Sequence, residues 1–154
     1  MELQIERLLD NIGKKIVNTL QKNARISFSD LGRKVGLSTP AATERVRKLE
    51  DAGVILGYHA VVDTAKVGFP VSAFIHLTTP VQHYPKVTSF MEDQDEALEC
   101  HHISGEESFI IKVVVPSVEH LESLVGKLSP FGQTKTSIVL SSSFVKQGIP
   151  IGDM

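Results

Sequence analysis

The chain lacks the features that mark secreted and membrane-spanning proteins. It has one cysteine, Cys100, in 154 residues, so no disulfide can form within a chain. No apolar run approaches the roughly 18 residues of a membrane helix. The N-terminal MELQIERLLD is acidic and lacks the apolar stretch of a signal peptide. There is no low-complexity segment. These absences predict a cytoplasmic protein with no membrane partner. The 42% apolar content suits one domain or two small ones.

Positive charge is concentrated in one part of the chain. The net charge is −2, but residues 12–49 hold nine Lys or Arg against two acids, hence +7. The other 116 residues therefore carry −9, and no arginine follows residue 48. A polyanion would be attracted to the first region and repelled by the rest. This asymmetry favours a nucleic-acid partner.

One segment has the pattern of two short helices joined by a glycine turn. It is residues 25–55, RISFSDLGRKVGLSTPAATERVRKLEDAGVI. Ser27 stands three residues before Asp30, the spacing of a capping box with Asp in place of Glu or Gln. Gly36 can adopt a positive φ and end the first helix. The apolar stripe of that helix is predicted to be Phe28, Leu31 and Val35.

The second helix of this pair is expected over residues 39–52. Ser38 is a suitable N-cap, Pro40 lies in the first turn, and Gly53 ends the helix. Its apolar stripe is Ala42, Val46 and Leu49, and an earlier helix carries Ile12, Ile16, Val17 and Leu20. Three helices can therefore share a core as a helix-turn-helix, whose second helix enters the DNA major groove.

The polar side chains of this region are the candidate DNA contacts. Arg and Lys bind phosphates or guanine edges, and Ser or Thr can bind either base or phosphate. Base contacts are expected from Thr39, Thr43 and Arg47, with Pro40 at the head of the helix. Phosphate or positioning contacts are expected from Arg33, Lys34, Ser38, Arg45 and Lys48. Two alternatives stay open: Arg45 braces the helix against its neighbours, or the whole region is a helical domain with a solvated charged face.

The rest of the chain alternates strand and helix patterns. Residues 54–62 predict a linking strand interrupted at Gly57, and residues 63–68 a hinge. The following segments predict strands at 71–78, 97–104, 109–115 and 134–145, and helices at 84–94 and after Ser117. This β-α-β-β-α-β order is the ferredoxin-like arrangement, with two helices on one face of four antiparallel strands.

The other face of such a sheet is expected to be apolar. It would carry Phe74, His76, Ile110, Val114 and Val139. We therefore predict that a second subunit covers it, which would also pair two DNA-binding domains for adjacent half-sites.

The chain resembles the Lrp/AsnC family, the feast/famine regulators of bacteria and archaea. The resemblance rests on ARISFSDLGRKVGLS, RVRKLEDAGVILGYHAVVD, HHISGEESFIIKVVV and TKTSIVL, in that order. It implies an α+β protein: a three-helix, winged-type helix-turn-helix domain (residues 1–53), a linking strand and hinge (54–68) and a ferredoxin-like domain (69–154). It also implies a transcriptional regulator of double-stranded DNA, not an enzyme. Homodimers would assemble to an octamer, and an amino acid or related metabolite, without a cofactor, would tune assembly or DNA affinity.

The effector site is expected at a turn between the middle strands. The family has Gly-x-Tyr-Asp there, whereas this chain has Gly105, Glu106, Glu107 and Ser108. Backbone N–H groups at such a turn can hold a carboxylate, hydroxyls add hydrogen bonds, and an acid can meet an ammonium. The last strand adds Thr134, Thr136 and Ser137. The alternative is a solvated hairpin tip and an ordinary edge strand.

Other chemistries are less favoured by the residues. Cys100 and His102 share a strand face, and His76 would complete a metal site only from a neighbouring strand; we expect no metal. Decarboxylases of the alternative haem pathway resemble this architecture and bind a tetrapyrrole, but that carboxylate-rich ligand needs cations, and the second domain is acidic. A third alternative is an amino-acid-sensing module that does not bind DNA, against which the basic face argues.

Overall fold

The computed structural model describes residues 2–146 and 148–152, and the chain forms two compact units. The first comprises Met1–Ala60 together with Phe144–Met154, and the second is Val61–Ser143. Among the described residues, no helix has both the length and the apolar character needed to cross a membrane.

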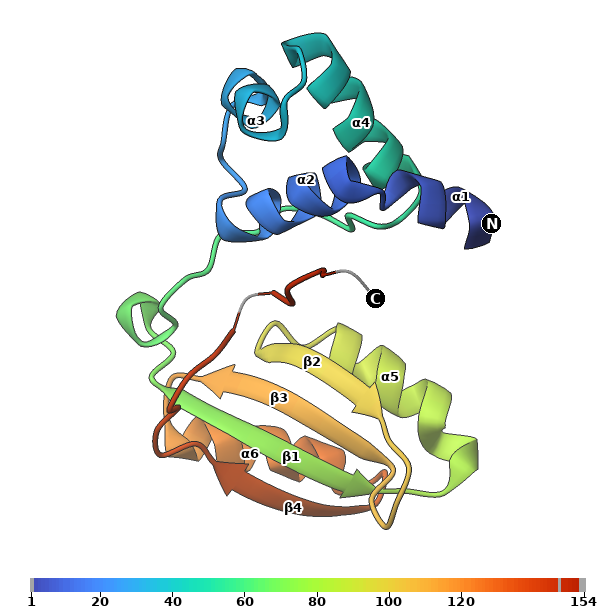
Figure 1. Cartoon of the computed structure of the whole chain (residues 1–154). Coiled ribbons are helices and arrows are strands. Elements are labelled where there is room, and N and C mark those ends of the chain that lie inside the picture. Colours follow the sequence, from blue (N-terminus) through green and yellow to red (C-terminus); the bar gives the residue numbers. More distant parts are fainter. Residues whose placement is uncertain (1, 147, 153–154) are drawn as a thin grey trace. The chain divides into compact units, whose positions relative to one another are not determined.

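The first unit is a bundle of short helices (Figure 1). They are α1 (Glu2–Leu8), α2 (Asn11–Lys22), α3 (Phe28–Val35) and α4 (Thr39–Asp51). The three expected helices are therefore present, and α1 precedes them. The bundle packs around an apolar cluster whose most buried members are Ile16, Leu31, Val46 and Leu49. Spacings of three and four residues place these side chains on the inner faces of their helices.

One residue of the expected stripe is not part of this core. Phe28 is 43% exposed, whereas Leu31 and Val35 are buried. Phe28 is the first residue of α3. A helical side chain covers the turn before its own position, and Phe28, at the first position of α3, has no helical turn before it. The prediction of a buried Phe28 was wrong for that reason.

The expected linking strand is not formed. Residues 54–62 are all described, and none belongs to a strand. Val54 and Ile55 instead pack on the helical core and donate their N–H groups to Leu49 O at 2.9 and 3.2 Å. Further along, the Tyr58 hydroxyl donates to the Glu50 carboxylate at 2.8 Å. An extended segment becomes a strand only with a partner, and none of the strands described in this chain pairs with it.

The second unit is a four-stranded antiparallel sheet with helices α5 (Tyr84–Glu92) and α6 (Val118–Leu128) on one face (Figure 1). The strands are β1 (Val71–Thr78), β2 (Ala97–His102), β3 (Phe109–Val115) and β4 (Gln133–Ile138), in the order β2-β3-β1-β4. Short 3-10 turns occupy Ala65–Val67 and Val81–His83. This confirms the ferredoxin-like prediction. The core beneath the helices includes Ile75, Leu77, Ile111, Val113, Leu124 and Leu128.

The last strand is shorter than expected. It was predicted over residues 134–145, but β4 ends at Ile138. Its partner explains the difference: Ile138 pairs with Ala73, and Val139 donates its N–H to Ser72 O at 2.8 Å. Because β1 begins at Val71, there is no further backbone for the following residues to pair with.

Candidate nucleic-acid interface and effector site

Local hydrogen bonds close the two helices of the helix-turn-helix. The Ser27 hydroxyl accepts the N–H of Asp30 at 3.1 Å and donates to the Asp30 carboxylate at 2.7 Å, which confirms the predicted capping pattern. Gly36 has φ 78°, the left-handed conformation that ends α3. The Ser38 hydroxyl accepts the N–H of Ala41 at 3.4 Å and caps α4. The turn between the helices therefore follows from the sequence.

One face of α4 carries exposed polar side chains at intervals of four residues. Thr39, Thr43 and Arg47 form a row on it, because residues four apart lie one above the other on a helix. The Thr43 hydroxyl donates to Thr39 O at 2.9 Å, and the Arg47 side chain is 66% exposed. The opposite face is buried through Ala42, Val46 and Leu49. The helix thus packs by one face and presents the other to solvent.

Arg47 and the exposed cations near this row make ion pairs that face solvent. Glu44 lies 3.5 Å from both Arg47 Nε and Lys48 Nζ, and all three side chains are about half exposed or more. On α3, exposed Arg33 pairs with exposed Asp30. Surface pairs of this kind contribute roughly 0–1 kcal/mol. Arg47, Lys48 and Arg33 can therefore exchange a carboxylate for a phosphate or a base edge at little cost.

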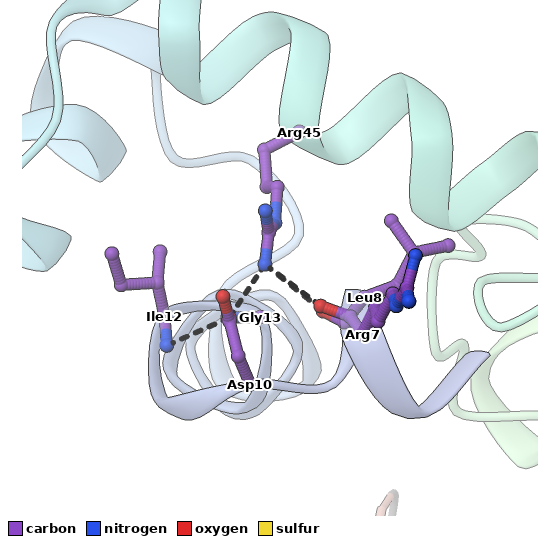
Figure 2. A network of polar contacts seen from close by, with 6 residues as sticks. All are labelled: Arg7, Leu8, Asp10, Ile12, Gly13 and Arg45. Atoms are coloured by element: carbon purple, nitrogen blue, oxygen red, sulfur yellow. Dashed lines mark hydrogen bonds and ion pairs between the residues drawn. The ribbon is translucent and has the colours of Figure 1, made fainter. Parts of the chain in front are cut away.

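Arg45 has a different environment from the other cations of α4 (Figure 2). Its side chain is 27% exposed, and one guanidinium nitrogen lies 2.5 Å from the Asp10 carboxylate. The same nitrogen is 3.4 Å from Arg7 O and 3.5 Å from Leu8 O. Of the two roles left open for Arg45, these contacts support bracing: it joins α4 to the junction of α1 and α2.

Asp10 also caps α2. Its carboxylate accepts the N–H groups of Ile12 at 3.1 Å and Gly13 at 2.8 Å. The Gly13 hydrogen bond, followed by the Arg45 guanidinium, holds the pKa of Asp10 below its ordinary value of 3.8, against an opposing effect of burial. A Cβ on Gly13 would lie 1.8 Å from Leu8 O, so only glycine fits at this close approach. The sequence pattern did not reveal this junction, whose parts lie far apart in the chain.

The remaining candidate DNA residues all lie on α3, α4 or the turn between them, and all are exposed. They are Arg33, Lys34, Ser38, Thr39, Pro40, Thr43, Arg47 and Lys48. The structure therefore gathers these eight on the two helices of the motif and the turn between them, and Arg45 has a different environment.

The predicted effector turn lies at one end of the sheet, beside the start of β4. Leu77 of β1 pairs with Phe109 on one side and with Thr134 on the other. The turn before Phe109 and Thr134 are therefore neighbours across β1. Gly105 has φ 130°, a conformation that favours glycine. Glu106 is exposed, and the Glu107 side chain is 32% exposed.

Ser108 anchors this turn. It is buried, and its hydroxyl donates to Thr79 O at 3.0 Å and accepts the N–H of Thr79 at 3.1 Å. The Thr79 hydroxyl donates in turn to Phe131 O at 2.6 Å, and His83 Nδ1 lies 3.1 Å from the same carbonyl. These bonds span up to 52 residues of chain, and no local sequence pattern indicates them. They hold the turn, the end of β1 and the start of β4 together.

The other hydroxyls predicted for the effector site point in different directions. Thr134 and Thr136 pair with Leu77 and Ile75, so they share the sheet face on which the helices pack. Ser137 pairs with Phe74 and lies on the opposite face. The structure therefore places Thr134 beside the turn, and Thr136 and Ser137 progressively farther along β4.

The face of the sheet without helices carries the apolar side chains expected there. Phe74, His76, Ile110, Val114 and Val139 alternate with the residues that face the helices. His76 Nδ1 is buried without a hydrogen bond, 3.9 Å from the Glu107 carboxylate. On the same face, opposite Phe74, Lys112 lies 2.9 Å from Glu99 and holds the pKa of that carboxyl below its ordinary value, with a smaller effect from His101.

The histidines and Cys100 do not converge. Cys100 and His102 face the helices, and the His102 ring packs against Tyr84 with centroids 4.7 Å apart. His76 lies on the opposite face of the sheet. Burial raises the pKa of the Cys100 thiol, and Glu92 adds to this effect. Within the described part of the chain, no group of three or more His, Cys, Asp or Glu is placed to hold a metal ion.

Fold and site together define a protein with a helix-turn-helix DNA-binding unit and a ferredoxin-like unit of the ligand-binding type. The model for the winged helix-turn-helix DNA-binding domain matches residues 9–55, and the model for the Lrp/AsnC ligand binding domain matches residues 72–148. The transcriptional regulator LrpC of Bacillus subtilis is 36% identical over 140 residues, covering 91% of this chain and 97% of that one. The leucine-responsive regulatory protein of Haemophilus influenzae is 34% identical over 155 residues, covering 96% of this chain and 92% of that one.

Solved structures agree with these sequence comparisons. The structure of Bacillus subtilis LrpC has a TM-score of 0.84 and covers 90% of this chain and 99% of its own. The structure of Mycobacterium tuberculosis LrpA is 30% identical in sequence and has a TM-score of 0.83. It covers 93% of this chain and 100% of its own. The chain belongs to the Lrp/AsnC family, and it is a DNA-binding transcriptional regulator rather than an enzyme. This confirms the resemblance and disfavours the decarboxylase alternative.

Proposed function

We propose that α4 reads DNA in the major groove through Thr39, Thr43 and Arg47. The observation that carries this proposal is the exposed row these residues form, opposite the buried face of the same helix. Arginine binds guanine in bidentate fashion, and threonine can bind a base or pack its methyl on thymine. The residues proposed for phosphate contacts are Arg33, Lys34, Ser38 and Lys48, with Pro40 at the start of the helix. Arg45 acts as a positioning residue.

Two substitutions test this assignment. Arg47→Ala should weaken binding to the preferred duplex by about 1–3 kcal/mol and relax specificity at one base pair. Lys34→Ala should weaken binding to all sequences about equally and reduce the salt slope by about one. Lys66→Ala is the control, since this lysine is 82% exposed and lies in the other unit. Specificity that is unchanged in Arg47→Ala would show that the groove-facing row is wrongly assigned.

We propose that the end of the sheet around the turn at residues 105–108 binds a free amino acid. The support comes from the matched ligand-binding domain, and from Glu107 and His76, which lie close together there. Backbone N–H groups of the turn would hold the carboxylate, and Glu106 or Glu107 the ammonium. Ser108 contributes by holding the turn. Thr134 is the nearest of the β4 hydroxyls, with Thr136 and Ser137 farther along.

A thermal-shift series with the common amino acids tests the effector proposal. Leucine is the first candidate, because one relative is named a leucine-responsive regulatory protein. A ligand at 100 times its Kd stabilises the folded protein by about 2.7 kcal/mol. Glu107→Gln should reduce the shift, whereas Glu122→Gln, an exposed acid on α6, should not. Absence of a shift with every amino acid would contradict the proposal.

We propose that the helix-free face of the sheet is covered by a second copy of the chain. Phe74, Ile110 and Val114 give this face its apolar side chains, and the ion pair of Lys112 with Glu99 lies on the same face. Dimers would assemble further to an octamer, as the family resemblance implies. The protein would act in the cytoplasm, where bacterial or archaeal DNA lies. In light scattering, Phe74→Glu should give a smaller particle than Val118→Glu, whose site on α6 is 54% exposed. A monomeric natural chain at micromolar concentration would contradict the proposal.

A further inference from the structure

The segment after the sheet returns to the helical unit and binds α2 through its backbone. The Asn18 side chain donates to Ile151 O at 2.8 Å and accepts the N–H of Ile151 at 2.9 Å. The Gln21 side chain donates to Ile149 O at 3.0 Å and accepts the N–H of Ile149 at 2.8 Å. Two side-chain amides, three residues apart on one helix, thus each hold one residue of the tail by both its backbone groups.

The spacing of the tail suits this arrangement. Alternate residues of an extended chain direct their backbone groups to the same side, so Ile149 and Ile151 can meet the two amides. Pro150 between them has no N–H group that would need a partner. The Ile151 side chain is half-buried against the apolar cluster of the helical unit, whereas Ile149 is 76% exposed. The tail is therefore recognised mainly through its backbone and one apolar anchor.

Gly148 allows the tail to approach α2 closely. A Cβ at this position would lie 2.2 Å from Gln21 Oε1 and 3.2 Å from Gln21 Cβ. The oxygen could move away, but it is the atom that accepts the N–H of Ile149. A side chain at Gly148 would therefore break the contact. At Gly152, by contrast, no heavy atom lies within 4 Å of the Cβ position.

We propose that residues 148–152 form a C-terminal latch, which docks on Asn18 and Gln21 of its own chain and gives the DNA-binding unit a second attachment. The chain passes from the first unit to the second after Ala60 and returns after Ser143. With the latch docked, two segments of the chain hold the DNA-binding unit, the one after Ala60 and the one after Ser143. With the latch released, only the segment after Ala60 holds it. The ligand-binding family match ends at residue 148, so Ile149 and Ile151 lie beyond it.

The latch has a consequence for DNA binding that rests on the proposed function. Two DNA-binding units of a dimer must be held at the spacing of two half-sites. A unit whose movement is already restricted loses less freedom on binding. Release of the latch is therefore expected to weaken DNA binding by about three- to tenfold, since affinity falls with the fraction of molecules in the competent arrangement.

Hydrogen exchange tests the docking directly. In the natural chain and in Gly152→Ala, the amides of Ile149 and Ile151 should exchange slowly, whereas in Gly148→Ala both should exchange at the rate of an unstructured peptide. The double variant Asn18→Ala/Gln21→Ala should behave like Gly148→Ala. Fast exchange of both amides in the natural chain would overturn the latch.

Two further measurements separate the parts of the proposal. In oligomers reassembled from isotope-labelled and unlabelled chains, amine cross-links between Lys146 and Lys22 should join residues of one label; mixed-label products would overturn docking on the same chain. In anisotropy titrations, Gly148→Ala should bind duplex DNA more weakly than Gly152→Ala. Equal or tighter binding would overturn the ordering role. If neither variant nor the natural chain bound DNA while the exchange contrast persisted, the latch would stand and the DNA proposal would fail.

Discussion

The junction between α1, α2 and α4 allows a quantitative test of how the recognition helix is held. Asp10 performs two tasks there: it caps α2 through the N–H groups of Ile12 and Gly13, and it pairs with Arg45. Asp10→Asn keeps a good cap and removes the charge, whereas Asp10→Ala removes both. Arg45→Met removes the cation but keeps an unbranched apolar stem.

The expected losses follow from the geometry. Removal of an N-cap costs about 1 kcal/mol, and a charge-assisted pair that is partly exposed contributes roughly 0.5–1 kcal/mol. Asp10→Ala should therefore cost about 1.5–2 kcal/mol of the free energy of unfolding, and Asp10→Asn about 0.5–1 kcal/mol. In the Arg45→Met background, Asp10→Ala should cost only the cap, so the cycle gives a coupling of about 0.5–1 kcal/mol.

Urea unfolding followed by circular dichroism at pH 7 measures these values, because the chain has no tryptophan for fluorescence. Zero coupling between Asp10 and Arg45 would refute the bracing role.

The dependence of stability on pH provides a second check. The pKa of Asp10 is lowered, so its contribution is complete above the ordinary value of 3.8 and is lost as the pH falls through the folded value. The difference in the free energy of unfolding between the natural chain and Asp10→Asn should therefore disappear at low pH. A difference that stays constant with pH would contradict a role for the Asp10 charge.

Three further predictions concern other parts of the fold. Gly132→Ala should destabilise the protein by about 1–3 kcal/mol in thermal unfolding, because its Cβ would lie 2.1 Å from Thr78 O. Gly126→Ala, at an exposed position of α6, should stabilise the protein by about 0.5–1 kcal/mol. Ser108→Ala should cost about 1–3 kcal/mol in urea unfolding, since it leaves the buried Thr79 N–H without its partner. Burial and Glu50 raise the pKa of Tyr58 to about 12, so any stability from its protonated phenol is lost as pH rises from 10 to about 12. Absorbance titration of the natural chain against Tyr58→Phe should assign to Tyr58 an ionisation near 12.

The sequence predicted those features whose signals are local. The capping serine Ser27, the turn glycine Gly36 and the spacing of Leu31 and Val35 are all contained within ten residues, and the structure reproduces them. Strand β3 was predicted to the residue, because its β-branched run is bounded by a turn and by Pro116. Periodicity also assigned the correct sheet face to Phe74 and its neighbours.

The features that the sequence did not predict depend on contacts between distant residues. A glycine such as Gly13 ordinarily weakens the start of a helix. In the structure, however, the backbone of Leu8 lies so close to Gly13 that no side chain fits there. The contacts of Asn18 with Ile151 span 133 residues, so no window of sequence indicates them. Residues 54–62 have strand periodicity, but a strand also needs a partner. Ser108 was predicted to bind a ligand because it lies in a turn. In the structure its hydroxyl donates a hydrogen bond to Thr79 O, directly after the end of β1.

We infer that this chain recognises specific DNA through α4. Selection from a randomised duplex library, followed by anisotropy titration of the selected and a scrambled duplex over a salt series, tests it most directly. We expect the selected duplex to bind at least about 10³-fold more tightly than the scrambled duplex, with an affinity that falls linearly with salt concentration on logarithmic axes. Equal affinity for both duplexes at every salt concentration would contradict it.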